Sequence, residues 1–68
     1  MTSLGDALPA EMARVRGEVL PAYLESGVGG LPAATMMRRD LDAAARAMAE
    51  GDVVAMLRAY EALKGWQL

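Results

Sequence analysis

The chain has 68 residues, contains neither cysteine nor histidine, and carries a net charge of −2 at pH 7. The length allows one domain, and the missing residue types exclude disulfides, thiolate or imidazole metal sites and the usual nucleophile–base pairs of catalysis. The acidic balance argues against nucleic acid and against an anionic membrane surface as partners, because both attract basic proteins.

The first predicted helix runs from Pro9 to Glu25 in a chain dominated by helix-forming residues. Asp6 is placed to cap it, and Pro9 suits a first turn, where the missing N–H costs nothing. Pro21 is expected to kink the helix or to restart it, because proline removes one backbone hydrogen bond. The apolar residues at helical spacing form one stripe, made of Leu8, Met12, Val15 and Val19.

A glycine-rich loop at Gly27–Gly30 precedes the second predicted helix, Pro32 to Glu50. Glycines before a helix start can bind anions, but the loop lacks the lysine and spacing of a Walker motif and no strand precedes it. We favour a hinge between helices, with anion binding as the alternative. The main apolar stripe of this helix is predicted to be Met37, Leu41, Ala44 and Met48.

The third predicted helix runs from Val53 to about Lys64. Gly51 suits the left-handed residue that ends a helix, and Asp52 suits the N-cap of the next one. The second and third helices should therefore form an antiparallel hairpin, and the first should pack across it or pair with another subunit. The apolar side of the third helix is predicted to be Val53, Met56, Leu57, Tyr60 and Leu63.

Hydrophobic residues form 54% of the sequence, and so short a chain has too little interior to hide them all. Small domains without disulfides or metals gain stability from other chains. We therefore expect an all-α protein that forms a homodimer or a higher oligomer. The dimer is expected to bury the Met/Leu/Ala stripe of the second helix.

Several side chains are candidates for contact with a partner. Met36 and Met37 point about 100° apart on a helix, so one of them is available for an interface, whereas Met12, Met48 and Met56 are expected in the core. Tyrosine and tryptophan are common interface anchors. For Trp66 the alternative is that it folds back to close the small core. The predicted partner-binding residues are Tyr23, Met36, Arg38, Arg39, Arg46, Tyr60 and Trp66.

The charged residues of the second helix indicate a solvated face and no metal or catalytic site. Asp40 and Asp42 point in different directions, so they do not converge on a metal or act as an acid–base pair. Arg38, Asp42 and Arg46 are spaced by four residues and can form ion pairs in series. No cofactor is expected.

The opening residues, MTSLGDALPAEM, have neither the basic start nor the apolar run of a signal peptide. No stretch of the chain reaches the roughly 18 apolar residues of a membrane span. We therefore expect a cytoplasmic protein that makes no membrane contact.

The segment AEGDVVAMLRAYEALKG resembles the joint of a tetratricopeptide repeat, but no second copy follows, so that family's function is not implied. The stretches VLPAYLESG, MMRRD and EGDVVAMLRAYEALKGW resemble short helical accessory proteins of Mu-like phages and prophages. These include quorum-sensing anti-activators and anti-CRISPR proteins. The resemblance implies a small inhibitor that binds a bacterial host protein in the cytoplasm of the host cell.

The expected function is therefore binding without catalysis, directed at a host protein. One alternative is an oligomer that sequesters a nucleotide signal, with the Gly27–Gly30 loop and Arg38 and Arg39 of two chains around a phosphate. Another is a minor virion or assembly protein, which would form a larger symmetric oligomer and bind no host partner.

Overall fold

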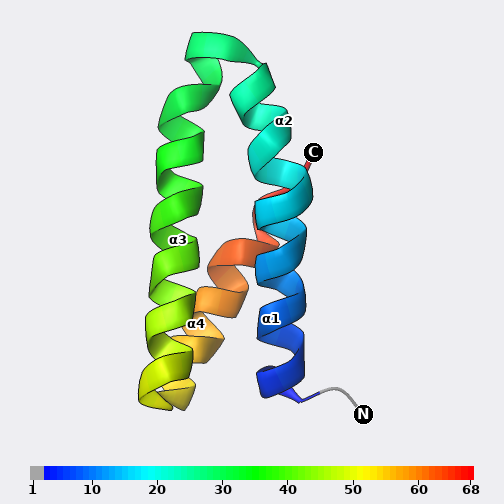
Figure 1. The fold of residues 1–68 in the computed structure, drawn as a ribbon. Helices are drawn as coiled ribbons and strands as arrows, with labels where there is room; N and C mark the ends of the chain where they lie inside the picture. Colours follow the sequence, from blue (N-terminus) through cyan, green and yellow to red (C-terminus); the bar gives the residue numbers. More distant parts are fainter. Residues whose placement is uncertain (1–2) are drawn as a thin grey trace.

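A computed structural model describes residues 3–68, and Met1 and Thr2 lie outside the described residues. The described chain is all-helical, as the composition predicts, and it measures 36 × 22 × 15 Å. One long helical column rises through α1 (Leu4–Arg14) and α2 (Leu20–Glu25). After a turn at the top, α3 (Leu31–Glu50) descends beside the column, and α4 (Val53–Lys64) returns from its foot (Figure 1). The α3–α4 hairpin is therefore confirmed.

The first helix begins five residues earlier than predicted, at Leu4. Ser3, and not Asp6, is its N-cap, because the Ser3 hydroxyl accepts a hydrogen bond of 3.2 Å from the Asp6 amide. Pro9 thus lies inside the helix. Its missing N–H would have bonded to the carbonyl of Gly5 four residues earlier, and this carbonyl belongs to an exposed residue that water can reach.

Between α1 and α2 the column passes through a π-helical segment, Val15–Val19. The Leu20 amide donates to the carbonyl of Val15, five residues earlier, instead of four. Pro21 accounts for the wider turn, because proline has no N–H for the regular ladder and its ring crowds the preceding turn. The predicted effect of Pro21 is therefore one wider helical turn, after which the backbone continues directly into α2.

The glycine segment forms a short 3₁₀ helix, Gly27–Gly30, that joins α2 to α3. Gly27 has a φ of 83°, which favours glycine. Gly30 is buried, and a Cβ there would lie 1.9 Å from the carbonyl oxygen of Tyr23. The close approach of two backbones sets how the start of α3 sits against α2.

The reversal between α3 and α4 follows the sequence closely. Gly51 ends α3 with a φ of 66°, and the Asp52 side chain accepts a hydrogen bond of 3.1 Å from the Ala55 amide. Both helices have the predicted extents to within a residue. The first helix packs across this hairpin: α1 contacts chiefly α4, and α2 contacts the upper part of α3.

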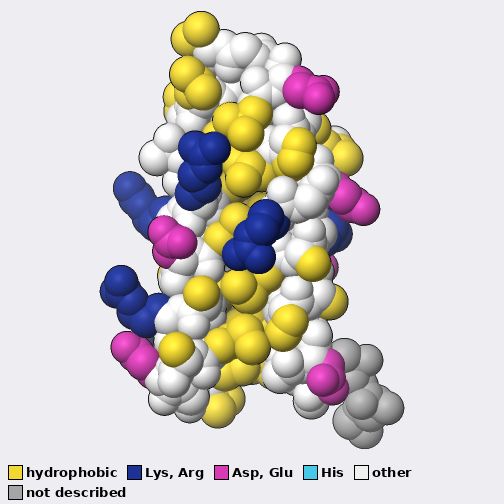
Figure 2. All heavy atoms as spheres, viewed as in Figure 1, with side chains coloured by type: hydrophobic (Ala, Val, Ile, Leu, Met, Phe, Trp, Pro, Cys, Tyr) yellow, Lys and Arg dark blue, Asp and Glu magenta, His cyan; other side chains and the backbone are white. Residues whose placement is uncertain are grey.

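The core lies between the α1–α2 column, α3 and α4. Hydrophobic side chains also line the boundary between α3 and the α1–α2 column (Figure 2). The stripe of the first helix is buried as predicted. In α3 the prediction is wrong for Met48, which is 36% exposed, because Ala47 turns toward the core instead. In α4 it is wrong for Val53 and Leu57, which are exposed while Ala59 is buried. The buried core residues are Leu8, Met12, Val15, Val19, Leu20, Ala34, Met37, Leu41, Ala44, Ala47, Ala59 and Leu63.

Burial of Met37, Leu41 and Ala44 within the chain also corrects the expected dimer interface. These side chains already contact α1, α2 or α4 in the core of one molecule. They are not available to a second copy without opening that core, so any dimer uses another face.

Candidate partner-binding surface

The outer side of α3 carries three arginines, at positions 38, 39 and 46. Spacings of one, seven and eight residues keep all three on one half of an α-helix. The opposite half holds the buried Met37, Leu41 and Ala44, so core packing forces the arginines outward. Figure 2 shows the basic side chains along the edge that α3 forms. The structure thus brings Arg38, Arg39 and Arg46 together, as predicted from the sequence.

These arginines surround a shallow hollow of about 430 Å³ on the surface of α3. We call this surface the arginine face. Thr35 and Asp42 add polar groups, although the Thr35 hydroxyl is already bonded to the Leu31 carbonyl at 3.1 Å. The residues that line the hollow are Thr35, Arg38, Arg39, Asp42, Ala43 and Arg46.

The arginine face contains no internal ion pair, contrary to the predicted series through Asp42. Among residues 3–68, the one ion pair with a nitrogen–oxygen distance within 4.0 Å joins Arg14 to Glu11, and both residues lie on α1. On an exposed helix such pairs contribute only about 0.3–0.5 kcal/mol, so solvation of the separate side chains competes with them. The guanidinium groups of the face are therefore free to bind an external acceptor.

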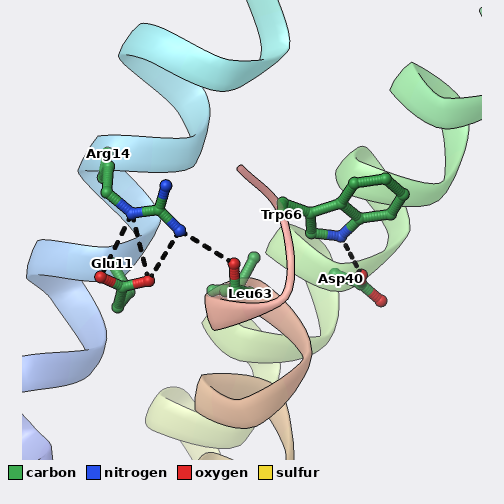
Figure 3. A network of polar contacts seen from close by, with 5 residues as sticks. All are labelled: Glu11, Arg14, Asp40, Leu63 and Trp66. Carbon is green, nitrogen blue, oxygen red and sulfur yellow. Dashed lines mark hydrogen bonds and ion pairs between the residues drawn. The ribbon is translucent and has the colours of Figure 1, made fainter. Parts of the chain in front are cut away.

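Trp66 packs against the body of its own chain. Its indole Nε1 donates a hydrogen bond of 2.7 Å to the Asp40 carboxylate, from α3 (Figure 3). Its ring meets that of Tyr23 edge-on, with centroids 6.2 Å apart and planes at 83°. The Tyr23 hydroxyl also donates to the Gln67 carbonyl at 3.4 Å. Trp66 therefore holds the tail that follows α4 against α2 and α3, which confirms the alternative expectation that it folds back onto the core.

The remaining two predicted site residues, Tyr60 and Met36, take no part in the contacts of Trp66. Tyr60, on α4, is half-buried against the core, and the Lys64 ammonium lies 5.5 Å from the centre of its ring. Met36 is 52% exposed whereas Met37 is fully buried, as their 100° separation predicts. Met36 lies one helical turn before Arg39 and Asp40 and so borders the arginine face.

A second polar link joins α1 to the end of α4 (Figure 3). Arg14 makes two kinds of contact: hydrogen bonds of 3.0–3.3 Å to the Glu11 carboxylate and one of 3.1 Å to the Leu63 carbonyl. The hydrogen bonds to Glu11 raise the pKa of Arg14 above its ordinary value. The guanidinium satisfies a carbonyl at the C-terminal end of α4, where a positive charge is favourable.

No pattern in the sequence identifies Asp40, Arg14 and Gly30 as positioning residues. Asp40 is 26 residues from Trp66, and Arg14 is 49 from Leu63, so no local pattern joins them. The glycine loop is predicted to be a hinge, with anion binding as the alternative, and neither prediction includes the close contact of Gly30 with Tyr23. About 12 Å of helix separates Gly30 from Arg38, so the loop and the arginines do not meet within one chain.

Comparison with protein-family models, curated proteins and solved structures finds no significant match to this chain. Within residues 3–68, no helix combines the length and the apolar character needed to cross a membrane.

Proposed function

We propose that this chain is a non-enzymatic binding protein, of the phage or prophage accessory type, that attaches to a bacterial host protein in the cytoplasm and inhibits or modulates it. The observation that carries the proposal is the arginine face of α3, where three exposed guanidinium groups have no partner among the described residues. Arginine is enriched at protein interfaces, and it recognises carboxylates through paired hydrogen bonds.

The charge distribution indicates an acidic partner. The arginine face holds three positive side chains and Asp42, a net charge of +2, in a chain whose net charge is −2. The rest of the molecule therefore carries −4. A basic patch on an acidic protein orients an approaching acidic surface and repels it elsewhere, which favours one docking orientation.

The neighbourhood of the face supplies an apolar contact as well. Met36 is half exposed beside it, and methionine adapts its shape to different surfaces. Charged groups alone give small net affinities because they lose hydration on binding, so an apolar neighbour adds the area that excludes water.

The first test is capture of a partner from a nuclease-treated bacterial lysate on the tagged protein, followed by mass spectrometry. The Arg39→Glu and Arg46→Glu variants reverse charges on the face. Arg16→Glu is the matched control, because Arg16 is also exposed but belongs to the π-helical segment. One near-stoichiometric protein should be retained by the wild type and by Arg16→Glu and lost with both face variants.

Two further readouts sharpen this test. Binding of the purified partner should weaken as salt rises, because the contacts are between exposed charges. Equal capture by the face variants and the control, or capture abolished by the nuclease, would contradict a protein partner at the arginine face. Trp66→Ala is a poorer probe because Trp66 holds the tail of its own chain.

The second candidate is sequestration of a nucleotide signal, and the hollow beside Arg38 and Arg39 is the observation that favours it. Guanidinium groups bind phosphate as readily as carboxylate. A cyclic nucleotide at a hundredfold excess over Kd would stabilise the fold by about 2.7 kcal/mol, measured as a rise in melting temperature. The Arg38→Gln/Arg39→Gln double variant should lose that rise. An unchanged melting temperature in the wild type would count against this candidate.

A further inference from the structure

A row of exposed charged side chains with alternating sign runs down the outer side of α3. At 100° per residue its members lie within about 80° of one another around the helix axis. Figure 2 shows basic and acidic side chains alternating along the edge that α3 forms. We call these residues the charged row, and in chain order they are Arg39, Asp42, Arg46 and Glu50. The row therefore presents two positive and two negative groups on one face.

The charged row has no ionic partner in its own chain. None of its members belongs to an ion pair among residues 3–68, although Asp42 and Arg46 have the spacing for one. The core lies on the other side of α3, because the fully buried Met37 is rotated about 180° from the middle of the row. The row is therefore open to a second molecule.

The other charged groups near α3 lie beside the row or away from it. Asp40 accepts the indole hydrogen bond described above, and Asp52 caps α4. Arg58 lines the hollow between α3 and α4. Glu61 is rotated about 160° from the buried Ala59, so it points away from the contact between these two helices. The alternation of sign therefore belongs to the row itself.

This alternation is complementary to itself when two copies of α3 run antiparallel. Arg39 and Glu50 lie five and six residues from Ala44, on opposite sides of it along the chain. Asp42 and Arg46 each lie two residues from Ala44, again on opposite sides. A twofold axis at this level places each arginine opposite a carboxylate of the second copy. One contact across the axis generates its mate by symmetry, so four opposite-charge contacts form.

We propose that two copies of this chain pair their α3 helices antiparallel through the charged row, about a twofold axis at the level of Ala44. The overlap from Arg39 to Glu50 covers about 18 Å of helix. Ala43 and Ala49 lie about 60° to either side of the middle of the row, and their small side chains let the second helix approach. A parallel pairing would instead place like charges together along the whole row.

The size of the contact predicts a weak and reversible dimer. A stable interface of standard size buries about 800 Å² per partner. That is about a fifth of the 4455 Å² surface of the described chain, and three turns of one helix bury less. Salt screens contacts between exposed charges. The dimer should therefore form at high protein concentration and low ionic strength.

The pairing also regulates the arginine face. Arg39 and Arg46 belong to both surfaces, so a dimer withholds them from an acidic partner and the two contacts compete. This consequence rests on the proposed function. The pairing itself is measured on purified protein without a partner, so its failure and the failure of the proposed function appear in separate experiments.

Sedimentation velocity in low salt, over a wide concentration range, tests the pairing. The wild type should move from monomer to dimer as concentration rises. Arg39→Glu and Glu50→Arg alone should each weaken the dimer by about tenfold in Kd, because each creates two like-charge contacts across the axis. Both positions are exposed, so circular dichroism should show unchanged helix content. A wild type that stays monomeric throughout would overturn the proposal.

Mixtures of two variants test the antiparallel register. Arg39→Glu mixed with Glu50→Arg restores every opposite-charge contact, so the mixture should dimerise with nearly the wild-type Kd. Arg39→Glu mixed with Asp42→Arg is the matched control. Its charge changes have the same size, but two contacts across the axis remain between like charges, so its Kd should stay about tenfold weaker. Equal recovery in the two mixtures, or recovery in neither, would refute this register.

Discussion

Gly30 offers the sharpest test of how α2 and α3 are held together. Its φ and ψ of −87° and −11° are open to any residue, so backbone conformation does not require glycine there. The close approach does: an alanine Cβ would lie 1.9 Å from the Tyr23 carbonyl oxygen and 2.8 Å from its carbon, where contacts under 3.0 Å are essentially never seen. Because the obstacle is backbone, Gly30→Ala must push α3 away from α2.

The expected cost is large for so small a protein. Overpacking of this kind costs about 3 kcal/mol, at the upper end of the usual range, because main chain must move. A 68-residue domain has a total stability of only about 3–10 kcal/mol. In a domain of this size each kcal/mol lowers the melting temperature by about 4–8 °C. The melting temperature, followed by circular dichroism, should therefore fall by roughly 12–24 °C.

Gly29→Ala is the matched control for this experiment. Gly29 is the preceding residue in the same 3₁₀ segment, its φ is not positive, and a Cβ there meets nothing within 4 Å. That variant should melt at or slightly above the wild-type temperature, because alanine reduces the entropy of the unfolded chain. Equal melting temperatures for the two variants would contradict this prediction, since they would show that the Tyr23 contact does not constrain the fold.

Three further changes test other parts of the structure. Gly17→Ala should raise stability by about 0.5–1 kcal/mol, because a Cβ there meets open space inside a helical column; a lower melting temperature would mean that the π-helical turn needs glycine. Trp66→Phe removes the hydrogen bond to the Asp40 carboxylate and should lower the free energy of unfolding by about 1–2 kcal/mol in urea titrations followed by circular dichroism. An unchanged urea midpoint would show that the tail does not depend on this bond. Asp52→Ala should lower the free energy of unfolding by about 1 kcal/mol through loss of the α4 N-cap, whereas Asp52→Asn should keep most of the stability of the wild type. Equal losses in the two variants would indicate that the charge of Asp52, and not its capping hydrogen bond, stabilises the helix.

Much of the helical framework could be predicted from the sequence because its causes are local. Gly51 and Asp52 end one helix and start the next through their own backbone and side-chain preferences, so the hairpin was placed correctly. The stripe of the first helix is buried because its spacing matches one helical face. The arginines of α3 were placed together for the same reason.

The start of the first helix was misplaced because two local signals compete. Pro9 is a good first-turn residue, yet Ser3 provides a cap six residues earlier, and an exposed carbonyl at Gly5 tolerates the missing bond. The exposure of Val53 and Leu57 had a different cause. Periodicity places apolar residues on a side of a helix, but the width of the neighbouring helices decides how much of that side is covered.

Features that depend on near neighbours along the chain can be predicted from the residues alone: helix content, the α3–α4 reversal, the inward stripe of the first helix and the outward arginines. Contacts between distant groups depend instead on how the helices pack. The docking of Trp66 on Asp40, the link from Arg14 to Leu63 and the contact of Gly30 with Tyr23 depend on the path of the whole chain. Such contacts form only after the helices have packed, so their partners leave no periodic signal in the sequence.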